Sequence, residues 1–142
     1  MGQTQLLLIA LTIVVVTIAV FIGITLVDKS MQQRQIDLLV NHTVAVASEA
    51  TGWRAKHSPY IGGGDSYLQL NTEGMQALLM AKNRLPGTID ITCATKEELN
   101  IVAVSDQYPD LGVLTKVVGE EVVETTIAYD GSITLETATC GQ

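Results

Sequence analysis

Residues 6–27 form an unbroken apolar run made almost wholly of Leu, Ile, Val and Ala, without a charge, Asn, Gln or Pro. As an α-helix at about 1.5 Å per residue the run is roughly 33 Å long, enough to cross the hydrocarbon core of a bilayer. A helix that is apolar on all sides belongs in lipid or among similar helices. The pattern therefore predicts a membrane or assembly segment near the N-terminus.

The helical pattern continues beyond this run. Apolar or small residues recur at helical spacing, with polar residues largely between them. These positions are Ile36, Leu39, Val40, Thr43, Ala47 and Ala50. Pro59 disfavours helix at Ser58 and cannot continue one. The sequence therefore predicts a single helix from about Thr4 to about Ala55, apolar all round in its first half and amphipathic in its second.

Three interpretations of the apolar run compete. A cleaved secretory signal peptide has a basic N-terminal region, a shorter apolar stretch and a small-residue cleavage site. Residues 1–5 carry no basic side chain, and a polar segment with Asp28, Lys29 and Arg34 follows the run. A single-pass anchor fits the length, but it does not require so long an amphipathic extension. An assembly helix explains both halves.

The remaining residues, 57–142, are predicted to form a β-rich head. Gly62, Gly63 and Gly64 indicate a flexible hinge, because a phosphate loop would add Gly-Lys-Ser/Thr after a strand. Asn71 and Thr72 then precede a predicted short helix, Glu73 to about Asn83, with Met75, Leu78 and Leu79 on one side.

Beyond Pro86 and Gly87 the apolar period changes to two. In residues 88–95, Ile89, Ile91 and Cys93 alternate with polar residues, as on a half-buried strand. Further strands are predicted at 99–104 and 114–118. A three-residue loop at 129–131 would pair Ala128 with Ser132, and so place Ile127 opposite Ile133.

The predicted fold class is α+β. It consists of a long N-terminal helix (residues 1–56) and a small C-terminal antiparallel head (residues 57–142) of four or five strands, with one sheet face packed on the helix.

The distribution of charged residues restricts the classes of partner that the protein can bind. Residues 87–142 hold ten acidic residues against Lys96 and Lys116. Clustered Lys and Arg are what hold phosphate backbones, so no nucleic acid is expected as a partner. The acidic surface is interpreted as a means of solubility.

Cys93 and Cys140 are the two cysteines of the chain. If the apolar segment leads the head into an oxidising compartment, the two are predicted to pair, which would stabilise the fold by roughly 4 kcal/mol. The alternative is two buried thiols in a reducing compartment.

Candidate chemistry is sparse. His42, His57 and the cysteines lack metal-ligand spacing. Asp106 and Asp110 lie in a turn-rich segment without the ligand count of a calcium loop. Asn41 begins a glycosylation sequon that falls in mid-helix. No catalytic constellation occurs, so neither an enzyme nor a cofactor is expected.

An apolar half-helix, an amphipathic half-helix and a β-rich head together resemble the type IV pilin family. The run Gly2-Gln3-Thr4-Gln5-Leu6-Leu7-Leu8-Ile9, and later Tyr60-Ile61-Gly62-Gly63-Gly64-Asp65-Ser66-Tyr67, look most like archaeal-type pilins and their bacterial relatives. The resemblance covers about the first 67 residues and is architectural over the head. Gln5 stands where, in one register, many bacterial pilins carry a glutamate.

The resemblance implies a major pilin of an extracellular type IV pilus-like filament, serving adhesion or motility at the cell surface. Its partners would be copies of itself in a helical homopolymer, the membrane before assembly, a prepilin peptidase, and an assembly ATPase with its membrane platform. Cleavage would fall after Gly2, making Gln3 the first residue, or Met1 would already be the mature start. Methylation of the N-terminus is also implied.

The filament core would comprise Leu6, Leu7, Ile9, Ile13, Val16, Val20, Phe21 and Ile24. A membrane-anchored pseudopilin of a secretion system and an archaellum-type filament subunit share this architecture and remain alternatives.

Overall fold

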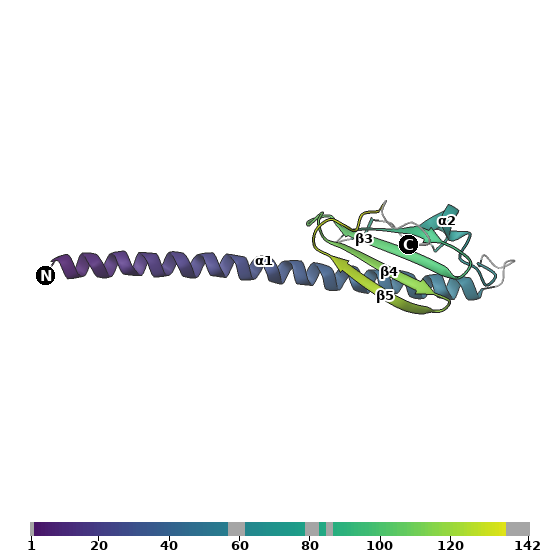
Figure 1. Ribbon diagram of the computed structural model, residues 1–142, viewed down its shortest axis with the longest axis horizontal. Coiled ribbons are helices and arrows are strands. Elements are labelled where there is room, and N and C mark those ends of the chain that lie inside the picture. The colour runs from purple at the N-terminus through teal and green to yellow at the C-terminus, as the bar shows by residue number, and fades with distance from the viewer. Residues whose placement is uncertain (1, 57–61, 79–82, 85–86, 136–142) are drawn as a thin grey trace. The chain divides into compact units, whose positions relative to one another are not determined.

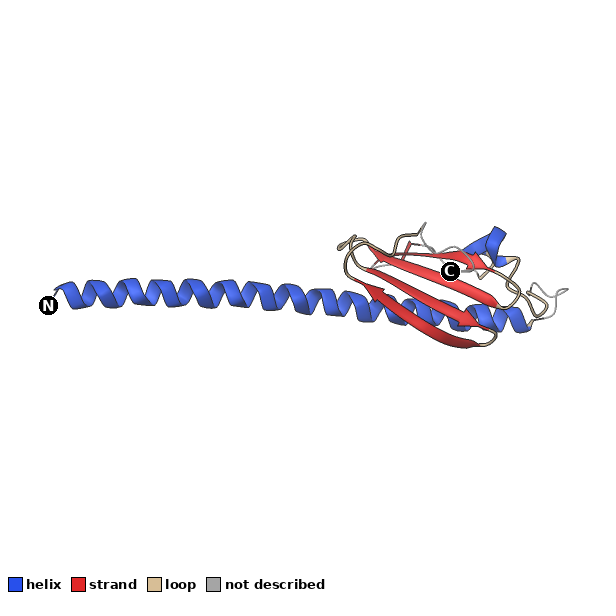
Figure 2. Ribbon diagram, viewed as in Figure 1, coloured by secondary structure: helices blue, strands red, loops and turns tan. Residues whose placement is uncertain are grey.

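The computed structural model describes residues 2–56, 62–78, 83–84 and 87–135. Helix α1 (Gly2–Ala55) is followed by the short α2 (Leu70–Glu73) and the 3₁₀ turn η2 (Gly74–Gln76). The strands are β1 (Asn83–Arg84), β2 (Gly87–Ala94), β3 (Glu98–Ser105), β4 (Gly112–Val118) and β5 (Glu121–Ala128) (Figures 1 and 2). The predicted α+β class is confirmed.

The chain divides into two compact units, residues 1–34 and residues 35–142. The second half of α1 therefore belongs to the same unit as the sheet. Helix α1 contains no proline and begins and ends within two residues of its predicted bounds. An unbroken backbone hydrogen-bond ladder is what a Pro-free stretch of this length permits.

In the unit of residues 35–142, the sheet-facing side of α1 forms the core. Its buried residues recur at helical spacing: Ile36, Leu39, Thr43, Val46, Ala47, Ala50 and Trp53. All of them except Thr43 belong to one hydrophobic cluster with sheet residues that include Leu99, Ile101 and Val113, each 0% exposed. The predicted packing of the helix on one face of the sheet is confirmed.

All strand pairs are antiparallel, and the order β1-β2-β3-β4-β5 makes the sheet a simple meander. The strands predicted at 88–95, 99–104 and 114–118 correspond to β2, β3 and β4. In β2 and β4, buried residues alternate with less buried ones, as expected of strands that pack one face on the helix, whereas β3 is buried on both faces around Ile101.

A β-bulge in β2 corrects the predicted alternation. Ile91 lies opposite Ile101, but Cys93 lies opposite Asn100, so Thr92 is an extra residue. Because neighbouring residues of β3 point to opposite faces, Cys93 is on the face away from Ile91. The prediction that Cys93 shares the face of Ile89 and Ile91 is wrong.

The predicted hairpin at Ala128 and Ser132 is also wrong. Strand β5 pairs with β4 through the tight turn at Gly119 and Glu120, with Val118 opposite Glu121 and Val113 opposite Ile127. Gly131 has the expected left-handed conformation, with φ of 72°. Its N–H, however, donates to the carbonyl oxygen of Asp110 at 2.9 Å, so the turn joins the loop before β4.

The predicted helix from Glu73 to Asn83 is shorter and begins earlier. Gly74 adopts a φ of 54° and a ψ of −140°, which ends α2 after one turn. Residues 79–82 lie outside the described part of the chain, and Asn83 begins β1. Met75 and Leu78 are buried, as their apolar spacing predicted.

The three glycines after α1 close the helix rather than form a free hinge. The N–H groups of Gly63 and Gly64 donate to the carbonyl oxygens of Trp53 and Lys56, each at 3.0 Å. A side chain on Gly63 would lie 2.5 Å from Cζ3 of Trp53. Glycine is therefore needed for close approach, since the segment folds back on the helix end. His57, Ser58 and Pro59, which were expected to end the helix, lie outside the described residues.

Candidate assembly segment

The eight residues predicted to form the filament core are all exposed. Their exposed fractions run from 56% at Val20 to 73% at Phe21. Within the unit of residues 1–34, nothing in the structure covers any side of the helix between Leu6 and Val27. The predicted core residues are thus not brought together by the fold of one chain.

The free-energy cost of leaving this surface in water is large. Sixteen large apolar side chains between Leu6 and Val27 are 52% to 73% exposed. Fully burying one such side chain stabilises by about 1.5–3 kcal/mol, so covering these partly exposed ones is worth on the order of 20 kcal/mol. That figure exceeds the total stability of an ordinary small domain. The segment therefore requires an apolar environment that the single chain does not provide.

The threonines inside the apolar run have their hydroxyl groups satisfied within the helix. Thr12 and Thr25 donate to the carbonyl oxygens of Ile9 and Ile22, each at 2.8 Å, and Thr17 donates to that of Ile13 at 2.7 Å. A hydroxyl that bonds to its own helix needs no water. These side chains are therefore compatible with lipid or with a dry helix bundle.

By length and composition, α1 includes a segment able to cross a membrane, none of which is buried. The described helix begins at Gly2, and a side chain there would meet nothing within 4 Å. Gly2 and Gln3, between which the predicted cleavage would fall, are both exposed and lie in the first turn of α1.

The amphipathic half of α1 is bound to the sheet by polar contacts as well as by its core face. The Thr115 hydroxyl donates to the Thr43 hydroxyl oxygen at 3.0 Å, and both side chains are 0% exposed. The Thr43 hydroxyl in turn donates to the carbonyl oxygen of Val40. At the periphery, the amide of Gln35 donates to Gln107 at 2.7 Å. These contacts fix the register of the helix on the sheet.

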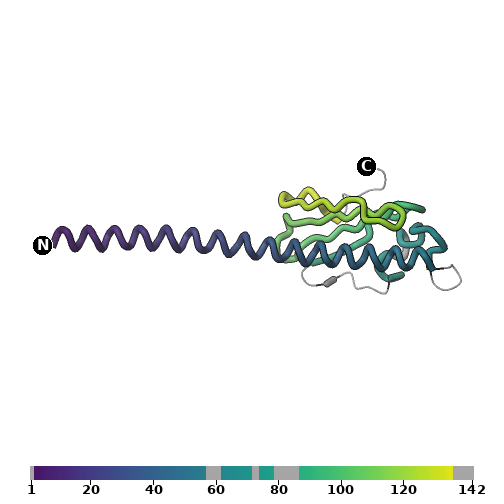
Figure 3. The backbone as a smooth tube through the Cα atoms, turned by 90° about the horizontal axis from the view of Figure 1, so that it is seen from below, coloured from purple at the N-terminus to yellow at the C-terminus, as the bar shows by residue number. Residues whose placement is uncertain are grey.

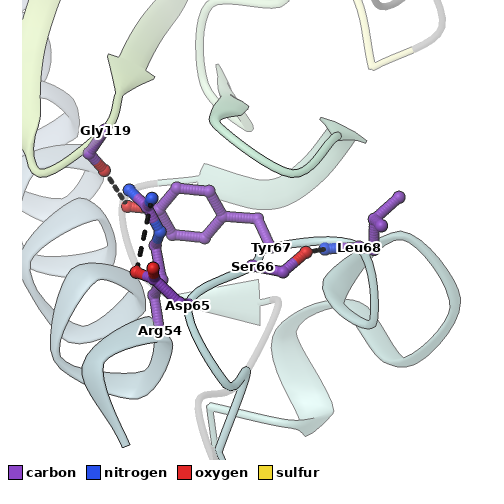
Figure 4. A network of polar contacts seen from close by, with 6 residues as sticks. All are labelled: Arg54, Asp65, Ser66, Tyr67, Leu68 and Gly119. Atoms are coloured by element: carbon purple, nitrogen blue, oxygen red, sulfur yellow. Dashed lines mark hydrogen bonds and ion pairs between the residues drawn. The ribbon is translucent and has the colours of Figure 1, made fainter.

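A second group of contacts lies where α1 ends, and sequence reasoning missed it (Figure 4). The Tyr67 hydroxyl donates to the carbonyl oxygen of Gly119, in the β4–β5 turn, at 2.6 Å. The Arg54 guanidinium lies 5.2 Å from the centre of the Tyr67 ring and 3.5 Å from a carboxylate oxygen of Asp65. The contacts join the helix end, the segment after it and the far end of the sheet.

Burial raises the pKa of the Tyr67 phenol above its ordinary value, and the neighbouring Arg54 partly offsets that effect. Its ring is fully buried, so an anion there would lack hydration. No local sequence signal indicates this role, because Tyr67 and Gly119 are 52 residues apart. We interpret the group as structural.

Of the two cysteines predicted to pair, only Cys93 lies in the part of the chain that the structure describes. Cys93 is 1% exposed and is not a free thiol, whereas Cys140 lies outside the described residues. The bulge directs Cys93 to the face on which Ile133 approaches Gly112. The chain after β5 therefore starts across that face, which suits a bridge to Cys140, and the pairing stays a prediction.

Apart from Cys93, the described residues considered in the sequence as candidates for metal binding or glycosylation lie in turns or in the helix. Across the described ranges, no group of three or more His, Cys, Asp or Glu could hold a metal ion. Asp106 accepts a bond from Thr88, and the backbone of Asp110 binds Gly131. Asn41 and His42 lie within α1, and His57 is outside the described part.

Comparison of the chain with protein-family models, with curated proteins and with solved structures found no match. The features of the molecule that bear on function are therefore the exposed apolar helix and the compact head.

Proposed function

We propose that this protein is the structural subunit, a major pilin, of an extracellular type IV pilus-like helical filament. The apolar half of α1 packs against the same segment of other copies and forms the filament core. The unit of residues 35–142 forms the outer surface. Before assembly the apolar half resides in a membrane.

The observation that carries the proposal is the apolar surface between Leu6 and Val27, exposed on every side of the helix. Lipid can cover it, and so can copies of the same helix once it leaves lipid. Ala10, Ala19 and Gly23 allow close approach between helices, and no side-chain contact opposes it at Gly23. The internally bonded threonines add no polar group that a dry core would leave unpaired.

The properties of the head are also consistent with the proposed filament. Its acidic residues suit a surface in water, and the core between α1 and the sheet makes it a firm unit. A predicted Cys93–Cys140 bridge would close the tail onto this unit. Attachment to surfaces or motility would follow from the filament.

The resemblance to pilins implies the remaining partners. A prepilin peptidase would cut beside Gly2 and Gln3, and an ATP-driven membrane platform would extract the subunit. No cofactor or nucleic acid takes part in this proposal.

Cryo-electron microscopy of filaments sheared from the cell surface tests the proposal. We expect density for residues 6–27 in the filament core, with the first ordered residue defining the processed N-terminus. The membrane fraction of the same cells is the matched sample. A chain found there only as a monomer or small complex, and absent from the filaments, would refute the proposal in favour of an anchor or a pseudopilin.

A further inference from the structure

The cut proposed beside Gly2 would make Gln3 the first residue of the mature chain. Gln3 lies in the first turn of α1 and is exposed, and a side chain at Gly2 would meet nothing within 4 Å. Cleavage of the peptide bond between the two residues leaves a new α-ammonium group on Gln3. The surroundings of that group decide which chemistry it undergoes.

The new ammonium has no carboxylate near it in its own segment. Residues 3–27 contain no Asp or Glu, and Gln5 carries a neutral amide. The first acidic residue, Asp28, lies about 37 Å further along the helix at about 1.5 Å per residue. In the described part of the first unit, residues 2–34, helix α1 is the only element, as Figure 3 shows. No other element of this unit can therefore bring an anion to Gln3.

A positive charge at this position is unfavourable for two reasons. The N-terminus of a helix carries a partial positive charge, which opposes a second positive charge. The apolar run that begins at Leu6 lies within one helical turn of Gln3, and it requires lipid or a dry filament core. An unpaired ion in such surroundings loses its hydration without compensation. A reaction that removes the charge would make the N-terminus compatible with them.

The side chain of an N-terminal glutamine can remove this charge by itself. The neutral α-amine of Gln3 attacks its own side-chain amide carbon, Cδ, and an N–Cδ bond closes a five-membered lactam. The Cδ–Nε2 bond breaks, and Nε2 leaves as ammonia with one proton of the amine. The atoms balance without an oxidant, a reductant or a second substrate. The positive end of the helix favours the neutral amine, which is the form that attacks.

The fold can accommodate this ring. Every bond that changes belongs to Gln3, so the helix from Thr4 onward keeps its conformation. The ring N–H remains as a neutral donor, like the other N–H groups of the first helical turn. Gln5 cannot react in the same way, because its nitrogen lies in a peptide bond.

We infer that Gln3 closes to a pyroglutamyl lactam after cleavage, so that the subunit enters the filament core with a neutral N-terminus. The closure rests on the proposed function, because the amine exists only if the chain is processed after Gly2. A lactam nitrogen is not a basic amine, so it would not accept the methyl group that the resemblance to pilins implies.

Mass spectrometry of sheared filaments tests the closure. Trypsin would release the N-terminal segment as one peptide ending at Lys29, the first Lys or Arg of the chain. Reductive dimethylation of the digest then labels every amine. A lactam leaves only the Lys29 amine to be labelled, and the peptide is lighter by one ammonia than the uncyclised sequence. A free amine on Gln3 would be labelled as well.

Two variants and a synthetic peptide supply the controls. Gln3→Ala has no side-chain amide and should show both labels, whereas Gln5→Ala should keep the lactam. Both variants are read in filaments and in the membrane fraction, so a loss of assembly would not hide the result. A synthetic peptide of residues 3–29 with a free N-terminus, carried through the same steps, measures the lactam formed during handling. We expect nearly all wild-type N-termini to be closed, and few of those of the peptide.

The outcomes separate the two proposals. Filament subunits that begin at Gln3 with a free or methylated amine, that begin at another residue, or that hold no more lactam than the synthetic peptide would overturn the closure and leave the filament proposal standing. A closed Gln3 on a chain found only in the membrane fraction would support the closure and refute the filament. A chain that is uncut and absent from filaments would contradict both.

Discussion

Replacement of Tyr67 by Phe removes one hydrogen bond and leaves the ring in place. The hydroxyl donates to the carbonyl oxygen of Gly119 at 2.6 Å, and the residue is 0% exposed. Phenylalanine can keep the ring contact with Arg54, at 5.2 Å from the ring centre. The substitution therefore tests the bond between the segment after α1 and the β4–β5 turn.

The expected cost follows from the environment of this bond. A typical hydrogen bond contributes about 0.5–1.5 kcal/mol net, and a buried group left unpaired costs about 1–3 kcal/mol. We expect Tyr67→Phe to lower the free energy of unfolding by about 1–2 kcal/mol. For a unit of this size the melting temperature should fall by about 5–10 °C.

The assay uses the only tryptophan of the chain as its probe. Trp53 is 5% exposed and lies beside the segment that leads to Tyr67, so its fluorescence should report unfolding of the head. Urea unfolding of the full chain in a mild detergent would compare Tyr67→Phe with Tyr129→Phe, whose parent side chain is 64% exposed. Equal midpoints for the two variants and the wild type would refute the structural role of the bond.

The same tyrosine predicts a dependence on alkaline pH. Burial raises the pKa of Tyr67 in the folded state above the ordinary 10.0. Above that ordinary value the unfolded chain loses the phenol proton while the folded chain keeps it, so stability falls as pH rises. The contribution is complete below about pH 10 and is lost as pH rises through the folded-state pKa. Tyr67→Phe should lack this loss, and identical alkaline slopes in the two proteins would contradict the prediction.

Two further pairs of substitutions probe the contacts of α1. Gly63→Ala places a Cβ 2.5 Å from Cζ3 of Trp53 and should destabilise by about 1–3 kcal/mol, whereas Gly52→Ala, with nothing within 4 Å, should stabilise by about 0.5–1 kcal/mol. Urea unfolding should show changes of opposite sign in the free energy of unfolding for these two variants, and changes of the same sign would contradict the prediction. Thr43→Val leaves the buried Thr115 hydroxyl without its acceptor, so adding Thr115→Val should recover about 1 kcal/mol. A double-mutant cycle that gives strictly additive losses would argue against this bond.

Local pattern was enough for the helix and for three strands. An apolar run of this length has few stable conformations, and the absence of proline up to Pro59 allows one helix through Ala55. Alternation around Ile89 likewise indicates a strand that packs one face on a helix, and the apolar run around Ile101 indicates a strand buried on both faces. These features depend on neighbours in sequence, so their signal is present in the sequence itself.

Other features depended on partners far along the chain. The bulge at Thr92, which turns Cys93 to the opposite face, is visible only once β2 is aligned with β3. The expected hairpin after Ala128 does not form, because the Gly131 N–H donates to the carbonyl oxygen of Asp110 in the loop before β4, and β5 pairs with β4 instead of with the residues after Gly131. The local sequence thus correctly predicted the left-handed conformation of Gly131, but it did not predict which strands pair.

By itself, the sequence determined that the first half of α1 needs an apolar environment and that the second half carries one apolar face, because spacing on a helix decides which side chains share a side. Only the tertiary structure decided how much of the sheet that face covers. Val113 of β4 lies beneath α1, while Ile127 beside it on β5 remains 38% exposed. Likewise, only the fold brings Tyr67 to Gly119, since residues so far apart meet through packing and not through any local rule.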